Sequence, residues 1–179
     1  MKPNAGRTIN GIPKHAREQA ANPILRIDGQ VEVPRALTLA ESLALPHERY
    51  LDGEQAPDDQ FIPPGDWSGP TLATLIAGAG PLPGAAWLHV SAGPYAVAIP
   101  IGDAPRVLAC DTLDGQPLPV DRGGPWRLII PDRGYNMGVK WVDRIEVCLT
   151  EPDDSAIRIA DARERARQYH RARESADKP

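Results

Sequence analysis

The sequence predicts a β-rich α+β domain, a mixed fold with a few short helices and a helical tail at its C-terminal end. The first observation is turn content: 20 prolines and 16 glycines are spread over 179 residues rather than confined to a repeat. That distribution favours many short elements joined by turns over a helical bundle. The second is that the apolar segments are short, rich in β-branched and aromatic residues and bounded by turn residues, as strands are.

Length, charge and apolar segments exclude several classes of protein. The chain has 179 residues, within the roughly 100–200 residues of a single domain. Its formal net charge is −4 and no basic stripe is interleaved with aromatic residues, which argues against a nucleic-acid partner. The N-terminal segment has no apolar core of signal-peptide length, and no other segment is long enough to span a bilayer. We therefore expect no membrane association and a cytoplasmic protein.

The composition divides the chain into three parts. Residues 1–22 are polar and are predicted to form an extended N-terminal arm with one short helical turn at 14–21. The domain itself is expected to span 23–150, and 151–179 is predicted to form a basic helical tail. Cys110 and Cys148 match no metal-ligand spacing and lie in apolar runs, so buried thiols are expected, with a disulfide left open.

Local patterns predict the first elements of the domain. Two alternating apolar runs flank the turn pair Asp28-Gly29, which predicts a hairpin over 24–33. Thr38 followed three residues later by Glu41 is a capping box, so a helix of about two turns should begin there and end at Pro46. The next segment, 47–66, is polar and rich in proline and glycine. A loop of that length inside a compact domain is typically functional or disordered.

The second half of the domain reads as one helix followed by strands. Leu72, Leu75 and Ile76 have the spacing of one helix face, which ends at a pair of glycines. Asp114-Gly115 predicts a turn. Strands are expected at 87–90, 95–100, 107–110, 126–130 and 139–147.

The tail has a helical composition and an uneven charge. Residues 153–155 can cap a helix, and 156–174 is rich in alanine, arginine and glutamate with a narrow apolar stripe. Such a helix is weak by itself. It is interpreted either as a solvated charged tail or as a contact surface for a protein partner.

Several phrases occur in a fixed order that is similar to one enzyme family. They are IDG (27–29), DWSGPTLATL (66–75), YAVAIP (95–100), DGQPLP (114–119), GGPWRLIIP (123–131) and VKWVDRIEV (139–147). Taken together, they resemble the molybdopterin-binding domain of the sulfite oxidase family of molybdopterin-dependent oxidoreductases. The resemblance covers residues 24–147.

The resemblance implies a mixed α+β domain that holds one molybdopterin, with a cysteine thiolate on the molybdenum. That metal would exchange an oxygen atom with a small substrate, and the cofactor would supply the difficult chemistry. The family's cysteine lies in the loop before the Trp-x-Gly phrase, here 49–66, which contains no cysteine or serine. The phrase 91–95 lacks the family's acidic residue, and Arg122 replaces its histidine. Molybdenum bound through a protein thiolate is therefore not expected.

The residues that match the family's phosphate-binding end are retained. Arginine suits this role because its planar fork donates two parallel hydrogen bonds to phosphate oxygens. By resemblance, the cofactor-binding residues are Arg127, Arg122, Asn136, Gly138, Val139 and Lys140. For some of these residues and their neighbours, a purely structural role is an alternative to cofactor binding.

Those alternatives are specific to each side chain. Arg127 would satisfy carbonyls beneath a loop, and Lys140 would be a solvated strand residue. Trp67 and Trp141 would belong to the core, as would His89. No catalytic residue and no metal ligand are assigned, because no phosphate loop, zinc motif or nucleophile elbow is present.

Two functions follow. The first is a molybdopterin-binding oxidoreductase domain with altered or lost molybdenum chemistry, which performs oxygen-atom transfer if it is active. The second is a cofactor-free binding module on the same fold, acting through 47–66 and the basic tail. The partner is an anionic small molecule or pterin phosphate in the first case, and a protein in the second. Whether the chain is an enzyme stays open.

Overall fold

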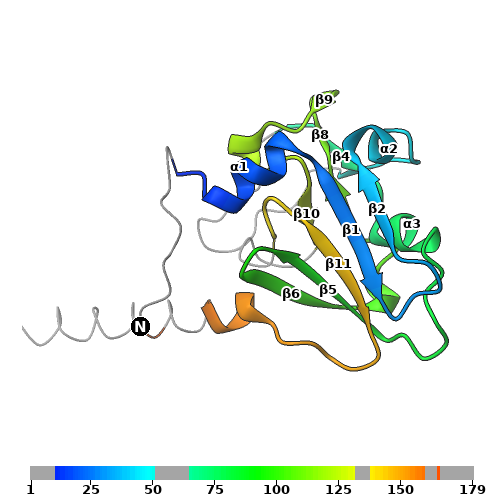
Figure 1. The fold of residues 1–179 in the computed structure, drawn as a ribbon. Coiled ribbons are helices and arrows are strands. Elements are labelled where there is room, and N and C mark those ends of the chain that lie inside the picture. The colour runs from blue at the N-terminus through cyan, green and yellow to red at the C-terminus, as the bar shows by residue number, and fades with distance from the viewer. Residues whose placement is uncertain (1–10, 51–64, 132–137, 160–164, 166–179) are drawn as a thin grey trace, which may run out of the picture.

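The computed structural model describes residues 11–50, 65–131, 138–159 and 165. Among them are three β-sheets and a few short α-helices, which confirms the β-rich α+β prediction (Figure 1). The helices are α1 (Lys14–Ala21), α2 (Leu39–Leu43) and α3 (Leu72–Ala77), with 3-10 turns η1 (Ile101–Asp103) and η2 (Val120–Arg122). The strands are β1 (Ile24–Gly29), β2 (Arg35–Thr38), β3 (Glu48–Tyr50), β4 (Trp67–Gly69), β5 (Trp87–Ala92), β6 (Tyr95–Pro100), β7 (Leu108–Cys110), β8 (Thr112–Leu113), β9 (Gln116–Pro117), β10 (Arg127–Ile129) and β11 (Arg144–Cys148).

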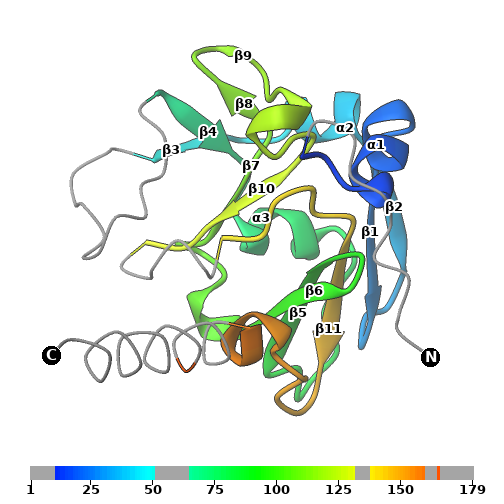
Figure 2. The same ribbon diagram turned by 90° about the vertical axis from the view of Figure 1, so that its left-hand side faces the viewer.

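The largest sheet has the order β2-β1-β11-β5-β6, and only β1 and β11 run parallel. Its strands alternate between buried and partly exposed residues, the pattern of a sheet with one face on the core. Helix α3 places its apolar side chains in that same core. Strands β7 and β10 pair with each other, and β3, β4, β8 and β9 form the third sheet (Figure 2).

The predicted hairpin over 24–33 is wrong. Strand β1 continues through the expected turn, because Asp28 and Gly29 pair with Glu146 and Val147 of β11. Its antiparallel partner is β2, which begins only after Pro34. Asp28 and Gly29 form part of a parallel strand pair instead of a turn. Their partners are far away in the sequence, so a local pattern cannot indicate this pairing.

Two other strand predictions need correction. The segment 47–66 was predicted as a loop, yet β3 occupies its beginning and pairs with β4, which starts at Trp67. The strand predicted over 139–147 is only Arg144–Cys148. It starts late because Trp141 has a φ of +60°, a left-handed conformation that interrupts an extended strand.

Local signals predicted other elements correctly. The capping box at Thr38 and Glu41 is present, although α2 is shorter than expected and ends at Leu43. Helix α3 begins after Thr71, whose side chain accepts from the Thr74 amide. Strands β8 and β9 form a hairpin around the predicted Asp-Gly turn.

Both ends of the described chain pack on the body. Within the N-terminal segment, α1 buries Ala16, and Gln19 donates to the carbonyls of Ile24 and Val142. At the other end, Asp154 and Ser155 accept hydrogen bonds from backbone amides of β6 and so cover its outer edge. A helix begins at 155 and is described to 159; most of the predicted tail helix lies outside the described residues. In the described ranges, no helix is long and apolar enough to cross a membrane.

Candidate anion-binding site

Strand β10 brings a buried guanidinium into the site. Arg127 is the first residue of this strand, lies opposite Cys110 of β7, and is only 2% exposed. Its guanidinium carbon lies 5.1 Å from the ring centroid of Trp67, where the electron-rich face of the indole stabilises a cation. Its Nη1 donates a 3.0 Å hydrogen bond to the carbonyl of Arg122. The core thus fixes this cation beside turn η2.

A glycine lies between two cationic side chains. Gly123 follows η2 and has a φ of +105°, a left-handed conformation that glycine adopts readily. A Cβ at this position would lie 3.0 Å from Cγ of Lys140 and 3.1 Å from Cδ of Arg127. Both side chains therefore pack against Gly123, which has no side chain of its own. Arg122, directly before it, is exposed.

The segment that precedes β11 forms the other side of the site. Val139 is fully buried, and its carbonyl accepts a 2.8 Å hydrogen bond from the amide of Leu128 in β10. Its neighbours Gly138 and Lys140 are half-buried. Asn136 lies outside the described residues. The structure brings the other predicted residues together around η2 and the first residues of β10: Arg122, Arg127, Gly138, Val139 and Lys140.

Trp67, Trp141 and His89, for which a place in the core was the alternative to a role in the site, differ in burial. Trp67 is 1% exposed in a small apolar cluster, as expected of a core residue. Trp141 is half-buried at the margin of the main core. His89 was predicted in the core, and that is wrong. It lies on the outer face of β5, with Nδ1 3.7 Å from Oε2 of Glu146.

This arrangement suits a phosphate monoester. Two guanidinium groups and an ammonium group lie around one turn, and a planar guanidinium binds two phosphate oxygens at once. Because Arg127 is buried, its charge is screened less by salt than that of an exposed arginine. The donor set fits the phosphate end of a pterin cofactor.

The cysteines do not fit a molybdenum site. The chain has two, and both are free thiols. Cys110 is fully buried, and burial, aided by the neighbouring Asp111 carboxylate, raises the pKa of its thiol well above the ordinary value. Cys148 ends β11, at the far end of that strand from Trp141, and burial also raises the pKa of its thiol. Neither cysteine lies in the segment 49–66, where the resemblance places the metal ligand.

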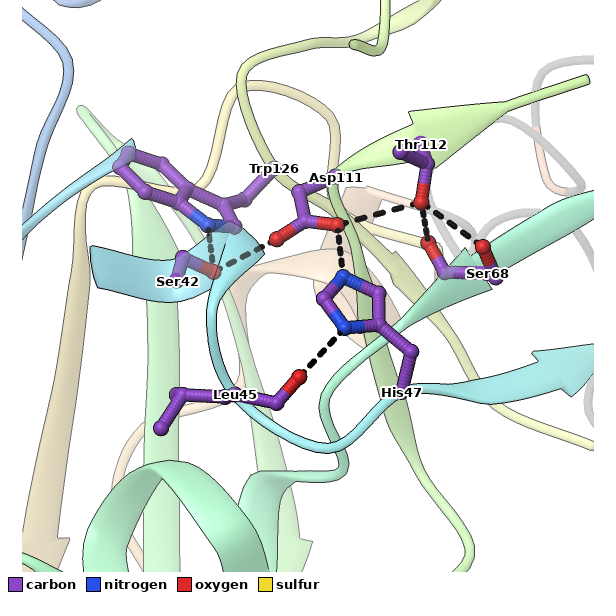
Figure 3. A network of polar contacts seen from close by, with 7 residues as sticks. All are labelled: Ser42, Leu45, His47, Ser68, Asp111, Thr112 and Trp126. Carbon is purple, nitrogen blue, oxygen red and sulfur yellow. Dashed lines mark hydrogen bonds and ion pairs between the residues drawn. The ribbon is translucent and has the colours of Figure 1, made fainter. Parts of the chain in front are cut away.

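A second polar cluster surrounds Asp111, which follows the last residue of β7, and the sequence did not indicate it. Asp111 is fully buried; its Oδ2 accepts from Ser42 at 2.6 Å, and its Oδ1 lies 2.7 Å from Nε2 of His47 (Figure 3). Ser42 in turn accepts from Nε1 of Trp126 at 2.9 Å. These residues come from segments separated by more than sixty positions, so no spacing pattern could have identified them. In the described ranges, no group of three or more acidic, histidine or cysteine side chains could hold a metal ion.

Three comparisons relate the chain to known proteins. A family model described as an oxidoreductase molybdopterin binding domain matches residues 11–156. The nitrate reductase [NADPH] of Fusarium oxysporum is 30% identical over 107 residues, which is 54% of this chain and 12% of that protein. The crystal structure of the sulfane dehydrogenase SoxCD from Paracoccus pantotrophus superposes with a TM-score of 0.59 at 24% identity, covering 72% of this chain and 38% of that one. The chain therefore spans only a minor part of either relative.

Proposed function

Because this chain belongs to the family of oxidoreductase molybdopterin binding domains, we propose that it holds the phosphate end of a molybdopterin around η2 without a protein thiolate on the metal. The single observation that carries the proposal is that Arg127 and Lys140 both pack against Gly123. Both side chains carry a positive charge, so their shared position disfavours the pair unless an anion lies near them. A bound phosphate would give both a common partner.

Each residue would have a distinct part in holding the phosphate. The guanidinium group of Arg127 would donate hydrogen bonds to the phosphate oxygens from the buried side of the site. The Trp67 ring and the Arg122 carbonyl orient this group. Arg122 would close over the phosphate from the exposed side of η2. Lys140 would add a point charge, and the backbone amides at 138–140 would donate where their geometry allows.

The metal end of the cofactor would be held differently from that in the rest of the family. When bound, molybdopterin supplies the oxygen-atom transfer chemistry. This chain offers neither a thiolate nor a low-pKa thiol near the site. We infer altered or lost molybdenum redox chemistry, with a small substrate only if the domain is active. A protein partner on the basic tail remains a separate prediction, because most of the tail lies outside the described residues.

The test is to express the protein in cells that synthesise molybdopterin and to measure both parts of the cofactor. Pterin is measured by fluorescence after oxidation, and molybdenum by mass spectrometry. We expect about one pterin per chain in the wild type and much less in Arg127→Ala, because that change removes the buried fork. Arg158→Ala is a matched control, since Arg158 is exposed and paired with Asp153 at the other end of the domain.

The outcomes separate the two functions. No pterin in the wild type would refute the proposal and favour the cofactor-free module. Pterin retained equally by Arg127→Ala would remove the role assigned to this residue. Molybdenum equal to pterin would contradict the loss of metal chemistry, while leaving the phosphate site in place.

A further inference from the structure

Turn η2, which carries Arg122, is held by hydrogen bonds from two side chains and one amide. The indole Nε1 of Trp141 donates to the carbonyl of Val120 at 2.7 Å, and the backbone N–H of Trp141 donates to the carbonyl of Gly123 at 2.8 Å. Between these two, the carbonyl of Arg122 accepts from Arg127. Three carbonyls of one short turn are thus occupied by donors from β10 and from the segment before β11.

The backbone of Trp141 is itself unusual. Its φ is +60°, a region that a bulky side chain rarely occupies because its Cβ crowds the backbone. Such conformations persist where surrounding contacts enforce them, and they cluster at functional sites. Here the left-handed turn has a direct result: it interrupts the extended chain one residue after Lys140, whose side chain packs against Gly123.

The indole ring is also enclosed by cationic or ionisable neighbours. The ring of His15, from α1, meets it edge to face with centroids 6.2 Å apart and an interplanar angle of 83°. The ammonium group of Lys140 lies 5.8 Å from the ring centroid, a favourable position for a cation over an aromatic ring. Trp141 therefore contacts Lys140 directly and reaches Arg122 through the backbone of η2.

We propose that Trp141 is the positioning residue that holds Arg122 and Lys140 against the buried Arg127, so that the three cations form one phosphate site. The assignment rests on the proposed function, because it concerns the same site. The indole N–H fixes η2, and with it the exposed Arg122, while the indole ring fixes Lys140. Without these contacts the site would keep the buried guanidinium and lose its organised outer part.

The test measures binding of inorganic phosphate to the purified protein by calorimetry at fixed pH and ionic strength. Trp141→Phe keeps an aromatic ring and removes the N–H that holds the Val120 carbonyl. The loss of one hydrogen bond should weaken phosphate binding about fivefold. Trp87→Phe is the matched control, since Trp87 is half-buried at the opposite end of the largest sheet, beside Cys148; it should bind phosphate like the wild type.

A double-mutant cycle distinguishes positioning from general stability. If Trp141 acts through η2, then Trp141→Phe should change phosphate binding less than twofold, roughly within the error of additivity, in an Arg122→Gln background. A merely structural role would produce the same fold-change in both backgrounds. If Trp141→Phe does not fold, as judged by urea denaturation, 3-benzothienylalanine at position 141 replaces it, because that analogue keeps the bicyclic shape and lacks only the N–H.

The results of these experiments distinguish the positioning role of Trp141 from the proposed function. Unchanged phosphate binding by Trp141→Phe or by the analogue would overturn the positioning role while leaving the proposed function intact. An equal loss with and without Arg122 would overturn it as well. A wild type that binds neither phosphate nor pterin would refute the proposed function, and the positioning role with it.

Discussion

The Nε2 atom of His47 lies 2.7 Å from Oδ1 of Asp111, a carboxylate that is fully buried. The other ring nitrogen of His47 lies 2.7 Å from the carbonyl of Leu45. Both ring nitrogens thus face an oxygen atom. The pair ties the start of β3 to the end of β7, next to the strand that carries Arg127.

The first prediction compares the two partners of this pair. Asp111→Asn should lower the free energy of unfolding by about 3 kcal/mol, because Asp111 contacts Ser42 through one oxygen and His47 through the other, and an asparagine NH₂ in place of one oxygen cannot accept, which leaves a buried partner unsatisfied. His47→Gln should cost about 1 kcal/mol, since His47 is 21% exposed and water can replace its contacts. Urea denaturation of both variants measures the difference. Equal losses, or a larger loss for His47→Gln, would contradict the central position assigned to Asp111.

The second prediction concerns the glycine between the cations. Gly123→Ala would place a Cβ 3.0 Å from Cγ of Lys140 and 3.1 Å from Cδ of Arg127, which is closer than side chains normally pack. The new residue would also have to adopt a left-handed backbone conformation. We expect a loss of stability greater than about 1 kcal/mol and weaker phosphate binding.

Gly115→Ala provides the control for backbone strain. Gly115 has a φ of +72°, and a Cβ there would meet nothing within 4 Å. It should therefore lose stability without any change in phosphate affinity. If both variants bind phosphate like the wild type, the crowding of the two cations is unimportant for the site.

The third prediction separates the charge of Arg127 from its shape. Lysine keeps the positive charge but has no planar fork and no second nitrogen to hold the Arg122 carbonyl. Arg127→Lys should therefore bind inorganic phosphate about tenfold more weakly, as expected for a lost bidentate contact. Calorimetry measures it, with Arg158→Lys as the exposed control. Wild-type affinity in Arg127→Lys would mean that charge alone is sufficient.

The fourth prediction is a pH dependence at the start of α2. The Thr38 amide donates a 2.7 Å hydrogen bond to Glu41, and the Thr38 hydroxyl donates another at 2.8 Å. These bonds lower the pKa of the Glu41 carboxyl, the backbone bond contributing most. Since the folded pKa lies below the unfolded one, the stabilisation is complete above the unfolded pKa and is lost as the pH falls through the folded pKa.

Glu41→Gln tests this directly. It should be less stable than the wild type at neutral pH, and the difference should shrink in acid as Glu41 becomes protonated. Thr38→Ala should cost about 1 kcal/mol at neutral pH, as for other N-cap residues. Thermal unfolding across the acid range measures both. A stability difference for Glu41→Gln that does not change with pH would contradict the proposed linkage.

Local signals explain which elements could be predicted. The capping box at Thr38 and Glu41 and the apolar spacing of Leu72, Leu75 and Ile76 are contained within single turns of helix, so neighbouring residues alone identify them. The hairpin over 24–33 failed because β1 continues through the expected turn to pair with β11, more than a hundred positions away, and its pairing with β2 begins only after Pro34. The strand over 139–147 failed because Trp141 adopts a backbone conformation that its residue type does not favour.

The sequence by itself determined the β-rich class, the family resemblance, the retained Arg127 and the missing thiolate, because each is a matter of residue type and order. Only the tertiary structure decided how these residues combine. It packs Lys140 and Arg127 against one glycine, joins the indole of Trp141 to η2 by a hydrogen bond, and brings His47 to Asp111. The physical reason is that these contacts join residues too far apart in the sequence for a local pattern, and burial of the whole core brings them together.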